Sequence, residues 1–292
     1  MSNIAEKFRI ARGDKFRLKD MSTDDTLDFK KEDAKEILKD LIHQTTVRQD
    51  ELYAENRYSL LIIFQAMDAA GKDSAIEHTM SGLNPQGCQV FSFKQPSTEE
   101  LDHDFLWRHY RALPERGRIG IHNRSHYENV LVSKVHPELL LHENLPRISS
   151  VRDVDEHFWN HRYDSIRCFE KHLSRNGMII IKFFLYLSKK EQRKRFLKRI
   201  DDSQKNWKFS AADLKERACW DEYMDAYEKA IQETATEHCP WYVVPADKKW
   251  FTRIAISNII LDTIKSLKLK YPELPESERG KLAEIKQQLE GE

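Results

Sequence analysis

Cysteine is scarce in this chain of 292 residues, which carries only four. The four are widely spaced and include no C-x-x-C pair, which argues against a disulfide or zinc framework and suits a reducing cytosol. No apolar run is long enough to cross a membrane, and the first residues lack the apolar core of a secretory signal. We therefore expect a soluble cytoplasmic protein with no membrane partner.

An excess of charge of one sign is also lacking, because 48 Lys and Arg residues balance 48 Asp and Glu residues. This balance argues against wholesale attraction to nucleic acid, so no nucleic-acid partner is expected. Local charge is uneven, however. Positions 189–199 (KKEQRKRFLKR) hold seven basic residues and one glutamate, and the first twenty residues are also basic. Each run is either a solvated face or a binding site for an anion.

Short apolar segments alternate with amphipathic ones along most of the chain. This alternation predicts right-handed crossovers and a central parallel five-stranded sheet between two layers of helices, a three-layer α/β/α fold. The expected strands are residues 60–66, 88–93, 118–122, 178–187 and 241–244. The expected helices are residues 31–56, 72–82, 98–111, 124–133, 151–175, 188–200, 211–234 and 250–268.

No internal repeat or low-complexity linker divides the chain, so we expect one domain with additions. Residues 1–30 are polar and basic with little periodicity, which predicts an extended arm. The domain takes up residues 31–270. The polar residues 271–292 are expected to end in an exposed or partner-packed helix.

The segment LLIIFQAMDAAGKDSAIEHTM combines an apolar run, a tight turn ending in Gly71-Lys72, and a helix. In such a strand–loop–helix, backbone N–H groups and the helix N-terminus bind a phosphate, and the lysine reaches its outer oxygens. The general pattern G-x-x-x-x-G-K-[S/T] is imperfect here, because Ala66 replaces the first glycine and Asp73 the hydroxyl residue. A plain strand–helix turn with a solvated lysine is the alternative. The predicted phosphate-binding loop is Ala69, Ala70, Gly71, Lys72, Asp73 and Ser74.

Two carboxylates accompany this loop. Asp68 would repel a phosphate unless a divalent cation lay between them, so it either holds such a cation or caps the following helix. Asp73 could bind a metal ion through water, but its place in the first helical turn favours stabilisation of the helix N-terminus.

A second polar group follows the strand expected at 118–122. Because the carboxyl ends of parallel strands meet at one edge of a sheet, Asn123, Arg124 and Glu128 should emerge beside Lys72. A guanidinium there can bind two oxygens of a transferring phosphoryl group. The plainer interpretation of Arg124 and Glu128 is an internal ion pair, four residues apart on a helix.

Further cations could contact an anionic substrate. Lys94, after the strand expected at 88–93, and Arg108, on the next helix, either reach an anionic acceptor or are surface charges. The basic run and the two helices around residues 201–210 predict a helical hairpin. Such a hairpin, at about residues 188–220, would be a mobile lid that closes over phosphates and excludes water.

Together these pieces resemble the polyphosphate kinase 2 family. These P-loop kinases share the architecture of the nucleoside-monophosphate kinases and use inorganic polyphosphate as phosphoryl donor. Asp68 and Asp73 both belong to the family's loop pattern, G-x-D-x-x-G-K-D. The matching segments, within about residues 30–270, are AMDAAGKDS (66–74), NRSHYENV (123–130), KNWKFSAADLKERACWDEYMDAYE (205–228) and PWYVVPADKKWFTR (240–253).

The resemblance implies a polyphosphate:AMP/ADP phosphotransferase that forms ADP and ATP reversibly. It implies that Asp68, Lys72 and Arg124 are catalytic, and that Mg²⁺, or Mn²⁺ in its place, bridges Asp68 and phosphate oxygens. It further implies a homo-oligomer, which we expect to be a dimer or a tetramer.

The resemblance also implies two sets of binding residues. The acceptor nucleotide is expected to contact Lys94, Arg108, Asn123, Arg124 and Glu128. Polyphosphate is expected to contact the lid residues Arg193, Lys198, Arg199, Lys205 and Lys208.

One departure from the family pattern bears on the acceptor. Asn123 stands where much of the family carries the aspartate of its second metal-binding motif, and Glu128 is expected to replace that carboxylate as a metal ligand. The form NRSHYE resembles the subgroup that phosphorylates both AMP and ADP. Two alternatives stay open, an ATP-dependent nucleoside-monophosphate kinase of the same fold and a non-catalytic polyanion-binding protein.

Overall fold

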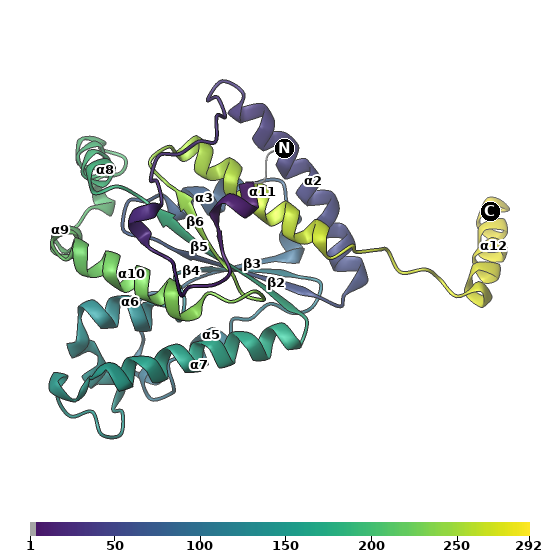
Figure 1. Cartoon of the computed structure of the whole chain (residues 1–292). Helices are drawn as coiled ribbons and strands as arrows, with labels where there is room; N and C mark the ends of the chain where they lie inside the picture. Colours follow the sequence, from purple (N-terminus) through teal and green to yellow (C-terminus); the bar gives the residue numbers. More distant parts are fainter. Residues whose placement is uncertain (1–3) are drawn as a thin grey trace.

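A computed structural model of the chain describes residues 4–292, apart from the side chain of Lys208. Its centre is one six-stranded sheet, made of β1 (Arg9–Ile10), β2 (Ser59–Gln65), β3 (Cys88–Ser92), β4 (Ile119–Asn123), β5 (Met178–Tyr186) and β6 (Trp241–Pro245). The strand order is β1-β6-β5-β2-β4-β3 (Figure 1). β2 to β6 are mutually parallel, and β1 pairs antiparallel with β6 at the edge.

Helices cover both faces of the sheet (Figure 1). Helices α1, α2, α3 and α11 lie on one face, and helices α6, α7 and α10 lie on the other. The α-helices are α1 (Ile4–Phe8), α2 (Ala34–Glu55), α3 (Lys72–Met80), α4 (Thr98–Leu101), α5 (Trp107–Tyr110), α6 (Glu128–Val135), α7 (Glu156–Arg175), α8 (Lys189–Asp201), α9 (Ala211–Ala218), α10 (Trp220–Thr234), α11 (Lys249–Ser266) and α12 (Glu276–Glu290).

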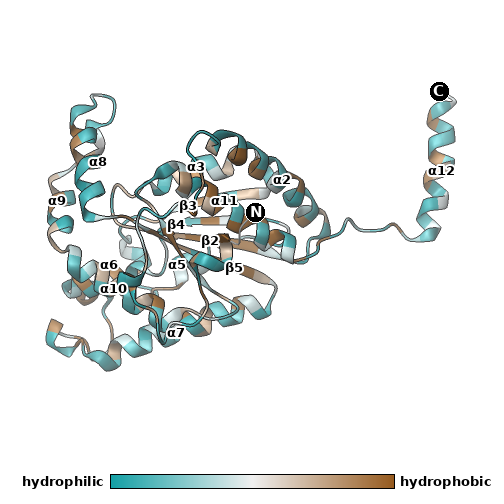
Figure 2. Cartoon of the chain, turned by 45° about the horizontal axis from the view of Figure 1, so that its top comes forward, coloured by the Kyte–Doolittle hydropathy of each residue, from teal (hydrophilic) through white to brown (hydrophobic). Residues whose placement is uncertain are grey.

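The central strand β2 explains this layering, because all seven of its residues are buried. Successive side chains of a strand point to opposite faces, so β2 contributes to two hydrophobic cores. Leu60, Ile62 and Phe64 pack with the helices of one layer, and Leu61 and Ile63 pack with those of the other. Figure 2 shows the resulting apolar strands in the middle of the molecule and a largely hydrophilic α8 at its edge. The predicted three-layer α/β/α architecture is confirmed.

The N-terminal segment differs from the expected extended arm, and it adds a sixth strand to the sheet. Ile4 and Phe8 of α1 are buried beside α11, and β1 extends the sheet along β6. The Leu18 N–H donates to a carboxylate oxygen of Glu228 in α10 at 2.6 Å. Sequence periodicity could not indicate this packing, because the few apolar residues lie in a charged segment and find their partners more than 200 residues away.

Three predicted helices also differ. The helix expected at 98–111 is two short helices, α4 and α5, and the one expected at 211–234 is divided into α9 and α10 at Cys219. The helix expected at 124–133 begins only at Glu128. The residues before it form a turn, in which the Glu128 N–H donates to the Ser125 carbonyl at 3.0 Å.

The C-terminal helix α12 lies apart from the body of the molecule at the end of an extended segment (Figure 1). All its residues are exposed. Within residues 4–292, no helix has the length and apolarity needed to cross a membrane.

Candidate active site at the carboxyl ends of β2 and β4

The loop between β2 and α3 is the predicted phosphate-binding loop. Ala69 (φ 61°) and Gly71 (φ 101°) both lie in the left-handed region, so the chain turns sharply before the helix begins at Lys72. A Cβ on Gly71 would meet only ordinary van der Waals contacts, so its backbone angle alone favours glycine. Ala66 is buried and is not among the described residues with positive φ, so this position does not need the glycine of the general pattern.

The side chain of Lys72 folds back over this loop. Its ammonium donates to the carbonyl of Ala66 at 2.7 Å. Burial, and next the Arg124 guanidinium, lowers the pKa of Lys72, and the neighbouring carboxylates partly offset this effect. The lysine therefore belongs to the same charged cluster as Arg124.

Arg124 lies between two carboxylates at the start of the β4–α6 turn. One terminal nitrogen is 3.4 Å from Asp68 Oδ1 and the other is 3.4 Å from Glu128 Oε2. The Glu128 carboxylate, and to a lesser degree Asp68, raises the pKa of Arg124 against the opposing effect of burial. Arg124 itself has φ 67°. The left-handed backbone at Arg124, a strained conformation for a non-glycine residue, is a common feature of functional turns.

The donor set around Arg124 fits a divalent metal ion whose remaining ligands come from substrate and water. In the described part of the chain, no group of three or more His, Cys, Asp or Glu side chains could hold a metal ion. Mg²⁺ is commonly bound by one or two carboxylates together with phosphates and water. Asp68 and Glu128 provide two carboxylates around one guanidinium, which fits that mode for Mg²⁺ and equally for Mn²⁺.

Direct hydrogen bonds join the β2–α3 loop to the end of β4. The Gln65 amide donates to Ser125 Oγ at 3.1 Å. The Asn123 amide donates to Asp73 Oδ1 at 2.7 Å and lies 3.5 Å from Ser92 Oγ. Asn123 therefore orients the loop aspartate, and Asp73 has a partner on β4 in addition to its place at the helix N-terminus.

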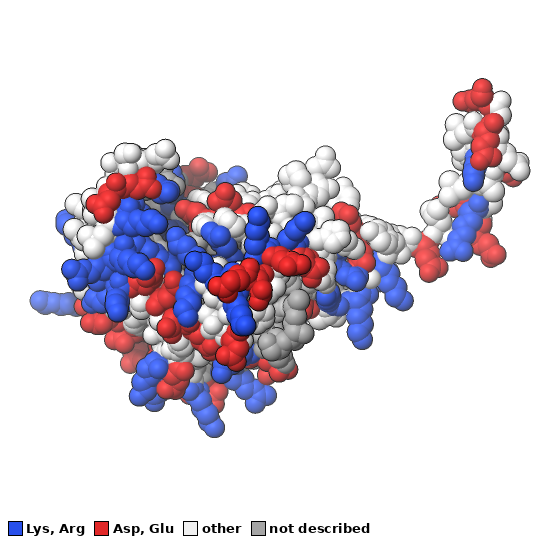
Figure 3. Space-filling view, turned by 90° about the horizontal axis from the view of Figure 1, so that it is seen from above, with Lys and Arg blue, Asp and Glu red and all other residues white. Residues whose placement is uncertain are grey.

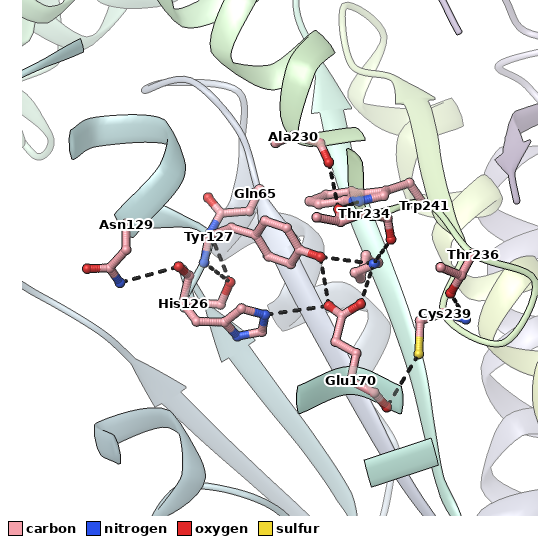
Figure 4. A network of polar contacts seen from close by, with 12 residues as sticks. Gln65, His126, Tyr127, Asn129, Glu170, Ala230, Thr234, Thr236, Cys239 and Trp241 are labelled. Atoms are coloured by element: carbon pink, nitrogen blue, oxygen red, sulfur yellow. Dashed lines mark hydrogen bonds and ion pairs between the residues drawn. The ribbon is translucent and has the colours of Figure 1, made fainter. Parts of the chain in front are cut away.

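A buried polar network packs against the β4–α6 turn. Figure 4 shows Tyr127 and Glu170 pointing at each other within this network. The Tyr127 hydroxyl donates to Glu170 at 2.7 Å. The Lys182 ammonium donates to Glu170 at 2.6 Å and to the Tyr127 oxygen at 2.9 Å. Both charges are buried but paired and hydrogen-bonded, as such groups must be. Since Tyr127 directly precedes Glu128, the network fixes the backbone that carries Arg124 and Glu128.

Two of the predicted acceptor contacts are not brought to this cluster. Arg108 pairs with Glu100 at 3.3 Å and lies over the Phe93 ring, with its central carbon 5.1 Å from the ring centroid. Lys94 is exposed beyond the end of β3. Within residues 4–292, no hydrogen bond or ion pair joins either cation to the β2–α3 loop.

The predicted lid cations fall into two groups. Arg193 and Lys198 are exposed on α8. Arg199 pairs with Asp213 of α9 at 3.7 Å, and Lys205 pairs with Asp202 at 2.8 Å. Figure 3 shows Lys and Arg gathered at the end of the molecule where α8 and α9 lie, opposite the projecting α12. The side chain of Lys208 lies outside the described part of the chain.

Lid residues that sequence reasoning missed contact the phosphate loop directly. Arg195 and Gln192, on the inner face of α8, donate to the backbone carbonyls of Asp68, Ala69 and Ala70. A signal was present for Gln192, which precedes the buried Phe196 by four residues and so shares its face of α8. Arg195 directly precedes Phe196, so the spacing did not indicate its contacts.

Comparison with known proteins identifies the family. Residues 28–272 match the family described as Polyphosphate kinase 2 (PPK2). The chain belongs to the polyphosphate kinase 2 family. The resemblance drawn from the sequence motifs is confirmed, and membership makes the chain a phosphotransferase of the kinase class.

Relatives match almost the whole chain. The ADP-polyphosphate phosphotransferase of Rhodopseudomonas palustris is 54% identical, over 97% of this chain and 98% of the relative. The AMP/ADP-polyphosphate phosphotransferase of Meiothermus ruber is 42% identical, over 95% and 98%. The crystal structure of polyphosphate kinase 2 from Arthrobacter aurescens TC1 matches with a TM-score of 0.86 and 39% identity, over 96% of each chain.

Proposed function

We propose that this polyphosphate kinase 2 transfers phosphoryl groups from inorganic polyphosphate to AMP and ADP, forming ADP and ATP, and that it catalyses the reverse reaction. The observation that carries the proposal is the placement of Arg124 between Asp68 and Glu128, beside Lys72 of the phosphate loop. The relatives named above, which match nearly the whole chain, support polyphosphate as the donor.

In the proposed mechanism the protein aligns donor and acceptor oxygens and neutralises charge as the phosphoryl group moves. Lys72 leaves the Ala66 carbonyl and contacts a phosphoryl oxygen, and Arg124 binds two oxygens with its planar fork. Asp68 and Glu128 would hold Mg²⁺, which supplies Lewis-acid stabilisation of the phosphate oxygens when it is bound. The Asn123–Asp73 hydrogen bond keeps the helix N-terminus in place.

The basic lid has two roles in this mechanism. Arg193 and Lys198 are exposed and can contact a long polyanion beyond the loop, while Arg199 and Lys205 must exchange their carboxylate partners for phosphate to do so. Closure of α9 over the site, with α8 held on the phosphate loop, excludes water, which would otherwise hydrolyse the donor.

The acceptor range depends on Glu128 in the proposed mechanism. AMP carries one phosphoryl group fewer than ADP, so it makes fewer contacts with the cations of the site. A cation held by Glu128 would supply a contact in place of the missing ones. We expect Glu128→Asn to lower kcat/KM for AMP by at least about tenfold more than for ADP, a difference of ~1.4 kcal/mol in barrier. The measurement uses saturating polyphosphate and Mg²⁺. An equal loss for both acceptors would reduce Glu128 to general support of Arg124.

The donor distinguishes the proposal from its two alternatives. Purified protein is given AMP and Mg²⁺ with either polyphosphate or ATP as the sole donor. We expect turnover with polyphosphate. Turnover with ATP and none with polyphosphate would identify an ATP-dependent nucleoside-monophosphate kinase. Binding of polyphosphate without turnover would identify a polyanion-binding protein.

A further inference from the structure

We propose that Arg195 and Gln192 of α8 are positioning residues. They hold the phosphate loop in place by hydrogen bonds to its backbone carbonyls, and so connect the loop to the lid helices α8 and α9. The proposal deepens the function proposed above and rests on it for its kinetic consequences. Neither residue contacts the carboxylates of the site. Both act through the backbone of the loop that carries Asp68 and precedes Lys72.

Arg195 is the most highly hydrogen-bonded side chain of α8. One terminal nitrogen donates to the carbonyls of Ala69 (3.0 Å) and Ala70 (2.8 Å). The other donates to the carbonyls of Ala246 (2.7 Å) and Asp247 (3.0 Å), which follow β6. The remaining N–H donates to Glu191 at 3.0 Å. All five donors of the guanidinium are used, and the side chain is only 9% exposed.

Gln192 contacts the same loop at Asp68, the residue directly before Ala69. Its amide N–H donates to the Asp68 carbonyl at 3.0 Å, and its amide oxygen accepts from Arg217 of α9 at 2.7 Å. Arg217 also donates to the Lys189 carbonyl at 2.9 Å. A continuous series of hydrogen bonds therefore runs from Arg217 of α9 through Gln192 of α8 to the phosphate loop.

Holding these carbonyls has a direct effect on anion binding. In a trans peptide the N–H of one residue points away from the carbonyl of the residue before it. Fixing the Asp68 and Ala70 carbonyls on α8 therefore turns the N–H groups of Ala69 and Gly71 to the opposite side of the loop. Carbonyl oxygens repel phosphate and N–H groups attract it, so the α8 contacts hold the loop in its anion-binding form.

Arg195→Lys tests the proposal while keeping the charge, because a lysine has one compact donor group and cannot reach four carbonyls on two loops. We expect kcat for polyphosphate-driven ADP phosphorylation to fall at least about tenfold, with KM for ADP changed less than about threefold, since loop alignment matters most in the transition state. Gln192→Met should lower kcat in the same direction by a smaller factor. The matched control is Arg175→Lys, the same change on the exposed face of α7.

Hydrogen exchange gives a second readout that does not depend on turnover. Amides of residues 66–73 should exchange faster in Arg195→Lys than in the parent or in Arg175→Lys. If Arg195→Lys does not fold, Gln192→Met carries the test alone. Unchanged kcat and loop exchange, or a rise in KM with kcat kept, would overturn the proposal. An inactive parent enzyme would contradict the proposed function instead, and exchange would still decide whether Arg195 and Gln192 hold the loop.

Discussion

At the residue scale, the site concentrates two cations, Lys72 and Arg124, and two carboxylates, Asp68 and Glu128, around one loop. Without bound substrate, the two positive and the two negative charges offset one another. In the proposed mechanism an entering phosphoryl group replaces the Ala66 carbonyl as the partner of Lys72, and carboxylate oxygens as the partners of Arg124. We propose that this places the cations to stabilise the charge that develops during transfer, an electrostatic contribution that is the largest one in many enzymes.

We expect Lys72→Met and Asp68→Asn each to lower kcat for ADP phosphorylation by at least about 100-fold, the loss typical of removing one preorganised electrostatic contact. The lysine would contact the transferring group and the aspartate would hold its metal ion. The measurement is steady-state kinetics with polyphosphate and Mg²⁺, with Lys281→Met on α12 as control. Activity within about tenfold of the parent, ~1.4 kcal/mol of barrier, would show that the assigned role is wrong.

A buried histidine predicts how stability depends on pH. His122 is fully buried in β4, and its Nε2 lies 3.0 Å from the Ala112 carbonyl. Burial lowers the pKa of His122 to about 4, from a usual value near 6.5. Between about pH 4 and pH 6.5, His122 is therefore protonated in the unfolded chain and neutral in the folded chain. The free energy of unfolding falls as the pH falls through this window.

Lowering the pH from about 7 to about 5 should thus reduce the free energy of unfolding by about 2 kcal/mol through His122 alone. The measurement compares urea unfolding of the parent and of His122→Asn at both pH values. The variant should lose less stability on acidification, whatever its stability at pH 7. An identical loss in both proteins would contradict the buried, neutral state of this histidine.

At the scale of secondary-structure elements, the five parallel strands and the helices after β2, β5 and β6 could be predicted, and partners distant in sequence could not. The strand ends place Lys72 and Arg124 at one edge of the sheet, as the alternating pattern indicated. The pattern could not tell that Arg108 has Glu100 as its partner, or that Arg195 faces the loop while Arg193 faces solvent. These differences depend on which face of a short helix meets the rest of the protein.

The N-terminal segment gives a test at this scale. Gly13 packs against the backbone of α10, and a Cβ built on it would lie 2.0 Å from the carbonyl oxygen of Gln232. Gly13→Ala must therefore displace the segment, and we expect a loss of about 1–3 kcal/mol in the free energy of unfolding, typical of an overpacked site. Gly280→Ala in α12, where nothing lies within 4 Å, is the control. Equal stability of the two variants in denaturant titrations would show that residues 4–29 do not pack as described.

At the scale of the whole molecule, a chain without net charge carries one strongly basic end (Figure 3). The neutral composition argued against wholesale attraction to nucleic acid, but it did not show where the cations gather. That arrangement follows from the fold, which brings α8, α9 and the loop after β6 to one end of the sheet. The homo-oligomer expected from the sequence stays a prediction, and so do the roles of the lid cations.

The basic end should make polyphosphate binding sensitive to salt, because a cationic surface releases counterions from a linear polyanion. Arg193→Gln combined with Lys198→Gln should weaken polyphosphate binding at least about tenfold and leave ADP binding nearly unchanged. By analogy with single-stranded nucleic acid, the slope of log Kd against log salt should fall by about 1.4, about 0.7 for each of the two charges removed. Lys281→Gln combined with Lys286→Gln removes the same charge from α12 and is the control. Equal weakening by both pairs would contradict a localised polyphosphate path.

The central claim, phosphoryl transfer from polyphosphate to a nucleotide, is tested most directly by following the phosphorus itself. Purified protein, AMP, polyphosphate and Mg²⁺, with no ATP added, are observed by ³¹P NMR. We expect polyphosphate signals to decline while ADP and then ATP signals rise by the same amount of phosphorus. Polyphosphate that stays intact, or that is lost only as free orthophosphate with AMP unchanged, would contradict the account.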